Sequence, residues 1–455
     1  MKYLLLVFTT FSITIANTFS QSSWHTLPNA PLADTNVARF DDIYFINSMT
    51  GWIVEGNSSP QDTGRVYKTT DGGHSWIFAN HSIKQYLRCV GFFDANTGII
   101  GAIFDSTHIL FRTTDGGFTW TDITQNISGI PPLAICGLSI VNSTTAYGSG
   151  RYYCPAGVIK TTNAGLNWIS VPADTSHVRS LIDCYFWTPD SGFIVGGYSP
   201  LNHYYSGHAS ILMTGNGGTN WTKVYSGSRT GEWCWKINFV NRQLGFASIE
   251  NFNLPTYILK TTNGGFTWQD IQLPSTIVDL EGIGFLNENT GWVGGWGSNF
   301  TGIPTYETTN GGTSWHLAGW GMAMNRIRFL SDTLAYAVGK TVYKYTSEPI
   351  GIVPISSEVP KHFSLQQNYP NPFNPTTNIG FRIADFGFVR LTLYDVLGKE
   401  IAVIVNEQLN PGVYVITWNA LNYPSGVYFY KLDVEDHGTK SGKRFSESKK
   451  MILLK

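Results

Sequence analysis

The chain of 455 residues is poor in charge: Asp, Glu, Lys and Arg together make up only 13% of it. Soluble domains carry about 25%. The formal net charge is −1, which argues against capture of nucleic acid or of an anionic membrane by a basic surface. After the N-terminal segment the chain has no run of 18 apolar residues, so no transmembrane span is expected in the mature chain.

Cysteine is scarce as well, with five residues that show no paired spacing and no Cys-x-x-Cys: Cys89, Cys136, Cys154, Cys184 and Cys234. This pattern gives no support for a zinc site. The odd number leaves at least one thiol outside any disulfide within the chain. We expect most of these cysteines to be buried as small apolar side chains, with one disulfide as the alternative.

The usual motifs of enzymes are also missing. The sequence contains no His-Glu-x-x-His, no Gly-x-Ser-x-Gly and no Gly-x-x-x-x-Gly-Lys, so it does not predict a zinc protease, an α/β-hydrolase or a P-loop nucleotide site. We predict neither a cofactor nor a metal site. What the chain has in plenty is glycine (48 residues) and aromatic side chains (14%), a composition that suits a turn-rich, all-β, extracytoplasmic protein.

Residues 1–20 have the pattern of a secretory signal peptide. Lys2 precedes an apolar run from Leu4 to Ala16, and the small residues Thr18 and Ser20 allow cleavage before Gln21. The alternative is a membrane anchor, but the apolar run is shorter than a bilayer span.

A nine-residue box recurs six times, first as Lys68-Thr-Thr-Asp-Gly-Gly-His-Ser-Trp76. Its closing tryptophans lie 44 to 53 residues apart, a period that indicates an array of units with four strands each. The Asp-Gly and Asn-Gly pairs provide positive φ angles in tight turns. A carboxylate or an amide oxygen can accept backbone N–H groups there, so Asp and Asn can alternate. The polar residues and tryptophans of the boxes are Asp71, Asp115, Asn163, Asn216, Asn263 and Asn310 with Trp76, Trp120, Trp168, Trp221, Trp268 and Trp315.

A second pattern, an alternating apolar strand followed by a polar turn, precedes each box and occurs seven times, first at Ile43–Trp52. The seventh unit ends near Thr346 without a box. The segment Ser22–Leu27 resembles the fourth strand of a unit, which normally follows a box, but no box precedes it. We therefore predict that residues 21–347 form a seven-bladed β-propeller, closed by the N-terminal strand, because closure removes exposed sheet edges.

The box resembles the Asp-box (BNR) repeat of bacterial neuraminidases. The repeat is similar to those of photosystem II assembly and stability factor-like propellers, sortilin-type propellers and xyloglucanase-type glycosidases. The resemblance implies a structural role for the twelve box residues. The alternative, a catalytic aspartate, is disfavoured because four of the six copies carry Asn.

After residue 347 the repeat motifs end and the chain carries different sequence motifs. Residues 348–362 carry three prolines and are interpreted as a linker. Residues 363–455 contain Asn368-Tyr-Pro-Asn-Pro-Phe-Asn-Pro375 and several short alternating strands, which predict a small immunoglobulin-like sandwich. These motifs closely resemble the type A C-terminal sorting domain of the type IX (Por) secretion system. The resemblance implies passage across the outer membrane of a Bacteroidota-like cell by that machinery, followed by removal of the domain and release or surface attachment. An adhesive sandwich is the alternative.

In a propeller the loops between strands two and three and those between blades emerge on one face. We expect a ligand site for a glycan or a protein on that face, because exposed aromatic and arginine side chains mark recognition surfaces. The candidate residues are Arg39, Arg88, Arg179, Arg326, Tyr152, Tyr153, Tyr204, Tyr205, Trp233 and Trp320.

The sequence thus predicts a secreted or surface-attached, non-catalytic propeller that binds or scaffolds. One alternative is a carbohydrate-active hydrolase that uses acids near the channel, namely Asp41, Asp42, Asp183, Asp279 and Glu281. The Arg-Ile-Pro signature of sialidases is absent, which disfavours that enzyme. The other alternative is a propeller that acts as an assembly factor.

Overall fold

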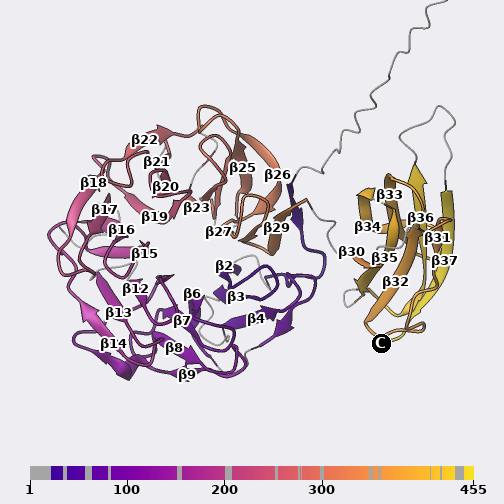
Figure 1. The fold of residues 1–455 in the computed structure, drawn as a ribbon, viewed down its shortest axis with the longest axis horizontal. Coiled ribbons are helices and arrows are strands. Elements are labelled where there is room, and N and C mark those ends of the chain that lie inside the picture. Colours follow the sequence, from indigo (N-terminus) through magenta and orange to yellow (C-terminus); the bar gives the residue numbers. More distant parts are fainter. Residues whose placement is uncertain are drawn as a thin grey trace, which may run out of the picture.

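The fold is a ring of β-sheets followed by a β-sandwich (Figure 1). The computed structural model describes residues 22–33, 38–56, 64–79, 83–150, 156–199, 207–251, 255–274, 277, 279–297, 302–347, 352–356, 360–409, 411–420, 423–435 and 445–455. Within these ranges the one helical element is the 3-10 turn η1 (Thr124–Asn126). None of the described helical segments is long and apolar enough to cross a membrane.

The described residues of the ring form seven sheets. The innermost strands are β2 (Arg39–Phe45), β6 (Tyr86–Phe92), β11 (Gly137–Ile140), β15 (Ser180–Phe186), β19 (Glu232–Phe239), β23 (Leu280–Phe285) and β27 (Arg326–Phe329). The second strands are β3 (Gly51–Gly56), β7 (Gly98–Ile103), β12 (Ala146–Gly150), β16 (Gly192–Tyr198), β20 (Gly245–Asn251), β24 (Gly291–Gly295) and β28 (Ala335–Val338). The third strands are β4 (Arg65–Thr69), β8 (Leu110–Thr113), β13 (Gly157–Thr161), β17 (His208–Thr214), β21 (Tyr257–Thr261), β25 (Pro304–Thr308) and β29 (Val342–Thr346).

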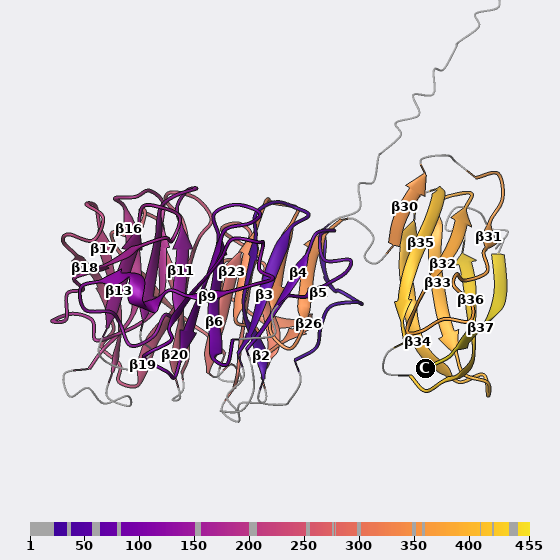
Figure 2. The same ribbon diagram turned by 90° about the horizontal axis from the view of Figure 1, so that it is seen from below.

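The outer strands are β5 (Ile77–Phe78), β9 (Thr121–Asp122), β14 (Trp168–Val171), β18 (Thr222–Ser226), β22 (Gln269–Gln272), β26 (His316–Met322) and β1 (Ser23–Thr26). A fifth strand, β10 (Ile127–Ser128), pairs in parallel with β14. The four main strands of each sheet run antiparallel to their neighbours, and successive side chains of a strand point to opposite faces of its sheet. This architecture is the predicted all-β propeller, seen from its edge in Figure 2.

The N-terminal strand closes the ring, as predicted from the missing seventh box. β1 pairs antiparallel with β29, with Ser23 opposite Thr346 and Thr26 opposite Tyr343. The Trp24 ring stacks on that of Trp320 in the preceding blade, with centroids 4.2 Å apart. The last blade is therefore assembled from both ends of the propeller segment.

The boxes form the turns between the third and fourth strands. In the first box the Oδ1 atom of Asp71 accepts hydrogen bonds from the hydroxyl of Thr69 at 2.8 Å and from the amide of Ser75 at 2.9 Å. In the fifth box the Oδ1 atom of Asn263 accepts from the amide of Thr267 at 3.0 Å. Because one oxygen makes the shared contacts, Asp and Asn can replace one another in this turn.

The third box departs from the others at Ala164, which takes the place of a glycine and has a φ of 53°. A Cβ atom in the left-handed region costs about 1–2 kcal/mol. We expect Ala164→Gly to raise the free energy of unfolding by about 1 kcal/mol, measured by denaturant titration. The reverse change at the equivalent position, Gly264→Ala (φ 73°), is the control and should lower it. Equal midpoints for all three proteins would contradict the expectation.

Four of the five cysteines, Cys89, Cys136, Cys184 and Cys234, lie among the described residues, and all four are buried thiols. This agrees with their interpretation as small core side chains. Cys154 lies outside the described residues. Burial in the core raises the pKa of the Cys184 thiol to about 12, so this thiol is not poised to react.

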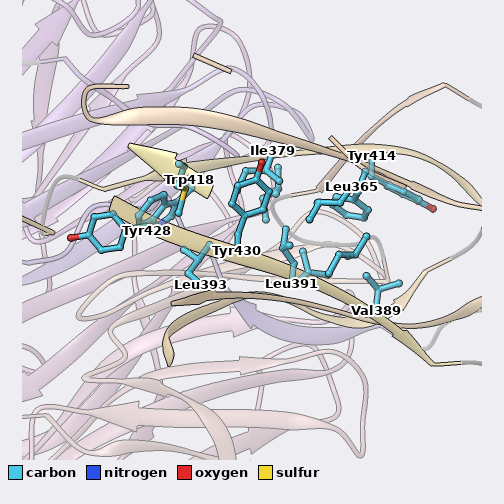
Figure 3. Packing of buried hydrophobic residues seen from close by; sticks show 14 of the residues in the cluster. Leu365, Ile379, Val389, Leu391, Leu393, Tyr414, Trp418, Tyr428 and Tyr430 are labelled. Atoms are coloured by element: carbon cyan, nitrogen blue, oxygen red, sulfur yellow. The ribbon is translucent and has the colours of Figure 1, made fainter. Parts of the chain in front are cut away.

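The sandwich consists of two four-stranded sheets. One contains β30 (Ile352–Ser356), β35 (Gly412–Asn419), β32 (Thr376–Ile383) and β31 (Ser364–Leu365), and the other contains β34 (Glu400–Leu409), β33 (Gly387–Tyr394), β36 (Gly426–Glu435) and β37 (Phe445–Leu453). Side chains such as Leu391, Tyr430 and Trp418 fill the space between the sheets (Figure 3). Strand β30 lies in the segment predicted as a linker and pairs with β35. The sandwich therefore begins before residue 363, a difference that the prolines of this segment concealed.

Candidate functional site

The channel of the propeller is lined by equivalent positions on the seven innermost strands. Because alternate residues of a strand face the same side, positions two residues apart form successive rings along the channel. The mouth ring, near the ends of these strands, consists of Tyr44, Gly91, Ser139, Tyr185, Asn238, Gly284 and Arg328. The ionic ring, two residues deeper, consists of Asp42, Cys89, Gly137, Asp183, Lys236, Gly282 and Arg326.

A network of ion pairs crosses the ionic ring. Arg326 donates two hydrogen bonds to Asp183, at 2.8 and 3.0 Å, and a third to Asp42 at 3.1 Å. Arg328 of the mouth ring donates to both oxygens of Asp42, at 3.1 and 3.2 Å. Both carboxylates are fully buried or nearly so, and burial alone would raise their pKa values. The arginines outweigh that effect, so the pKa of each carboxyl group lies below its usual range.

Lys236 is the charged residue of the ionic ring that forms no ion pair within this network. Its side chain is 1% exposed, and its Nζ atom has no hydrogen-bond partner in the described part of the chain. Burial, reinforced by the positive charge of Arg326, lowers the pKa of Lys236 to about 7. With Arg326 and Arg328, the two rings carry three cationic side chains against two carboxylates, so this part of the channel has an excess of positive charge.

The channel opens beside the mouth ring into a cavity of about 580 Å³. Six of the seven innermost strands contribute to its lining, through residues that include Tyr44, Tyr185, Asn238 and Arg328. A deeper cavity of about 190 Å³ reaches the ionic ring and is lined by Lys236 and Arg326 as well. The two cavities share Tyr44, Tyr185, Asn238 and Arg328. They form a shaft with aromatic and polar walls and a positively charged floor.

Below the ionic ring, β-bulges change the direction of several side chains. The register of β2, β6, β15, β19 and β23 shifts at equivalent places, and such bulges re-aim a side chain. Arg39 there binds Asp41 at 2.8 Å and pairs through both terminal nitrogens with Glu281. Arg88 also pairs with Asp41. In this bulge layer the two arginines, Arg39 and Arg88, are matched by two carboxylates, Asp41 and Glu281.

A pair of buried carboxyl groups, Glu250 and Asp279, lies toward the end where the innermost strands begin. The two carboxyl groups lie within hydrogen-bond reach of one another, and both oxygens of Asp279 and one of Glu250 have no other hydrogen-bond partner among the described residues. Burial raises the pKa of Asp279 to about 6, and burial with the nearby charge of Asp279 raises that of Glu250. Asp279 also has a φ of 54°, a conformation that costs energy for a residue with a side chain. The two carboxyl groups are therefore suited to share a proton.

The structure brings three of the four predicted arginines together, and each of the three forms an ion pair with a buried carboxylate. Arg39, Arg88 and Arg326 are buried in the channel network. Arg179 lies apart, with its guanidinium 6.0 Å from the ring of Tyr198. Their partners Asp41, Asp183 and Glu281 were expected near the channel, but the pairs that join different blades, such as Arg39 with Glu281, could not be predicted from local sequence.

The predicted aromatic residues do not form one exposed patch in the described structure. Trp233 is buried, next to Ile182 and Trp235, and Trp320 packs against Trp24 at the outer edge of the ring. Both indole rings therefore serve packing within the propeller. Tyr152, Tyr153, Tyr204 and Tyr205 lie outside the described residues. The described residues contain no cluster of three or more His, Cys, Asp or Glu that would hold a metal ion.

Sequence reasoning missed Tyr44, Tyr185, Lys236, Asn238, Glu250 and Arg328 as channel residues. A signal was present for five of them. They stand on innermost strands, at two positions where three of the seven repeats carry the small residues Gly, Ser or Cys, and a polar residue in a buried strand is informative. Alignment of the seven repeats on the channel face finds this set, whereas a search of the loops does not.

Comparison with protein families matches residues 367–446 to the secretion system C-terminal sorting domain. Comparison with curated proteins finds no match. Among solved structures, YCF48 bound to D1 peptide is similar, with a TM-score of 0.50 and 18% identity over 73% of this chain and 99% of that chain. YCF48 from Cyanidioschyzon merolae has a TM-score of 0.50 and 16% identity, over 71% of this chain and 98% of that chain.

A GH74 enzyme from Niastella koreensis has a TM-score of 0.49 and 14% identity, over 79% of this chain and 59% of that chain. The identities to YCF48 are low, so those two likenesses concern the fold alone. The match to the sorting domain shows more than the fold. It assigns the chain to export by type IX secretion, to the cell surface or the extracellular space. The chain thus combines a β-propeller of the fold seen in YCF48 with a secretion system C-terminal sorting domain.

Proposed function

We propose that this protein is a secreted, non-catalytic binding module whose ligand enters the channel beside the mouth ring. The observation that carries the proposal is the shaft: a cavity of about 580 Å³ that six blades line and that narrows toward a positively charged floor. Ligand sites in proteins are concave, with aromatic walls and a few polar groups that fix orientation. Tyr44, Tyr185 and Asn238 supply such walls and such a group.

The site differs from the one expected from the sequence, which lies on the opposite face of the propeller. Two of the arginines expected there, Arg39 and Arg88, are held by buried carboxylates, so they have little capacity left for a ligand. At the mouth, by contrast, the side chain of Arg328 keeps 27% of its surface exposed. A glycan or a protein segment is the class of ligand that we propose. In a similar structure YCF48 is bound to a peptide, which supports a propeller of this fold as a peptide receptor.

The test is to screen the purified protein on an array of glycans and an array of peptides, beside a variant with Tyr44→Ala and Tyr185→Ala. We expect this variant to lose binding of every ligand that the unchanged protein retains, since each aromatic side chain removed from a site weakens it by about 1–3 kcal/mol. The matched control carries Tyr204→Ala and Tyr205→Ala. If the control loses binding and the mouth variant keeps it, the ligand site is not at the mouth.

A second candidate function is hydrolysis of a glycoside. It is favoured by the Glu250 and Asp279 pair, because a carboxyl group whose pKa is about 6 can act as a general acid near neutral pH. Turnover of chromogenic glycosides by the purified protein, lost in Asp279→Asn, would support this function. The same turnover in the variant would come from a contaminating enzyme.

A further inference from the structure

The deeper cavity of about 190 Å³, called the inner cavity from here on, is lined by a buried lysine, Lys236, which is unusual for the interior of a protein. A lysine ammonium group that is 1% exposed normally has a carboxylate or several carbonyl groups around it, because an unpaired buried charge is costly. The Nζ atom of Lys236 donates no hydrogen bond to a carboxylate or a carbonyl group in the described part of the chain. Its side chain nevertheless lines a cavity of about 190 Å³ rather than packed core. The space and the missing partner occur at the same place.

The surrounding charges show what kind of partner is missing. Lys236 faces Arg326 from β27, Asp183 from β15, Asp42 from β2 and Arg88 from β6, with the thiol of Cys89 nearby. Asp183 and Asp42 are already held by Arg326 and Arg328, and Arg88 by Asp41. The immediate surroundings therefore have an unmatched positive charge and no unmatched negative one.

We propose that the inner cavity is a binding site for a carboxylate, held by Lys236 together with Arg326 and Arg328. Two or three cationic donors that converge on one small space are the arrangement that a carboxylate requires. The carboxylate is either a free small ion or the tip of a longer ligand that fills the mouth. The second case rests on the proposed function, because the longer ligand must enter through the mouth ring.

The site predicts that binding is coupled to a proton. Lys236 must be charged to hold the carboxylate, and its lowered pKa of about 7 means that it loses this charge as the pH rises through neutrality. The carboxylate stays ionised above pH 6, so only the lysine changes its state over this range. The apparent affinity is therefore highest near pH 6 and falls about tenfold between pH 6 and pH 8.

The experiment uses acetate as the probe, with acetamide as its neutral counterpart, at constant ionic strength and at pH 6, 7 and 8. Calorimetry and the shift of the thermal midpoint report binding to the purified full chain. We expect acetate to bind, acetamide not to bind, and the acetate effect to weaken with rising pH. In a second arm N-acetyltriglycine and its amide replace these probes. Tighter binding of the peptide acid than of acetate identifies the tip of a longer ligand as the source.

Two variants make the result decisive. Lys236→Met should abolish the response to acetate without lowering the thermal midpoint, because it removes a buried charge that has no partner. Lys223→Met, which changes an exposed lysine of β18, should respond as the unchanged protein does. Equal effects of acetate and acetamide, or an acetate response that persists in Lys236→Met, overturns the proposal. Either result leaves the mouth-ring screen unaffected, so failure of the carboxylate site is distinguishable from failure of the proposed function.

Discussion

Removal of residues 348–455 is expected to abolish appearance of the protein on the cell surface and in the medium. The deleted segment contains the sorting domain that assigns the chain to type IX secretion. The propeller has its own closed ring and its own cores, so it should fold and remain inside the cell envelope. Cell fractionation and immunoblotting with an antibody to the propeller measure the distribution. Undiminished surface or medium fractions would refute the assignment.

A fusion gives the matching gain of function. A periplasmic reporter protein that carries residues 348–455 at its C-terminus should leave the cell, whereas one that carries residues 363–455 should do so less well. The shorter tail lacks β30, which pairs with β35 along Ile352–Ser356, and an unpaired sheet edge destabilises a small sandwich. Equal export of both fusions would mean that β30 contributes nothing to the domain that the export machinery recognises.

Asp183→Asn is expected to lower the free energy of unfolding of the propeller by about 3–5 kcal/mol. This is the range for breaking a buried ion pair by removing one partner, because the other charge remains in the interior. Arg326 would keep one hydrogen bond, to Asp42, but would lose its two-nitrogen contact with the carboxylate. Denaturant unfolding followed by tryptophan fluorescence measures the change. An exposed carboxylate in a turn, changed as Asp190→Asn, is the control and should alter stability by less than about 0.5 kcal/mol.

The same pair makes a prediction for pH. The pKa of Asp183 is lowered in the folded protein, so its stabilising effect is complete above the unfolded value of about 3.9 and is lost as the pH falls below it. The unchanged protein should therefore lose more stability between pH 5 and pH 3 than Asp183→Asn does. A double variant, Asp183→Leu with Arg326→Met, should be more stable than Asp183→Asn, since it buries no unpaired charge. A double variant less stable than the single one would show that the pair itself is a net source of stability.

The architecture could be predicted from local sequence because the same strand and turn patterns recur along the propeller segment. The box fixes a turn through contacts between residues no more than four apart, and the missing seventh box indicated that β1 completes the last blade. Both inferences depend on short-range physics that a single sequence displays. The start of the sandwich was harder to predict. Strand β30 forms by pairing with β35, which lies some 60 residues further along the chain.

The candidate site was much less accessible to sequence reasoning. Arg326 finds Asp183 from a blade 143 residues earlier, and no local pattern specifies such a partner. The bulges that shift the innermost strands also carry no motif, although they decide that Arg88 and Glu281 face the channel. Sequence reasoning placed both the arginines and the acids Asp41, Asp42, Asp183 and Glu281 near the channel, but which carboxylate binds which arginine is decided only when the ring is closed.

Joining Ser23 to Thr346 has a consequence for biosynthesis. The segment that carries β1 leaves the ribosome long before its partner β29 has been made. Contacts between such distant segments are slow to form. Until then β1 has no strand to pair with, and unpaired strands favour aggregation. We expect chaperones of the cell envelope to protect this interval, and chains that terminate before residue 342 to be degraded instead of accumulating.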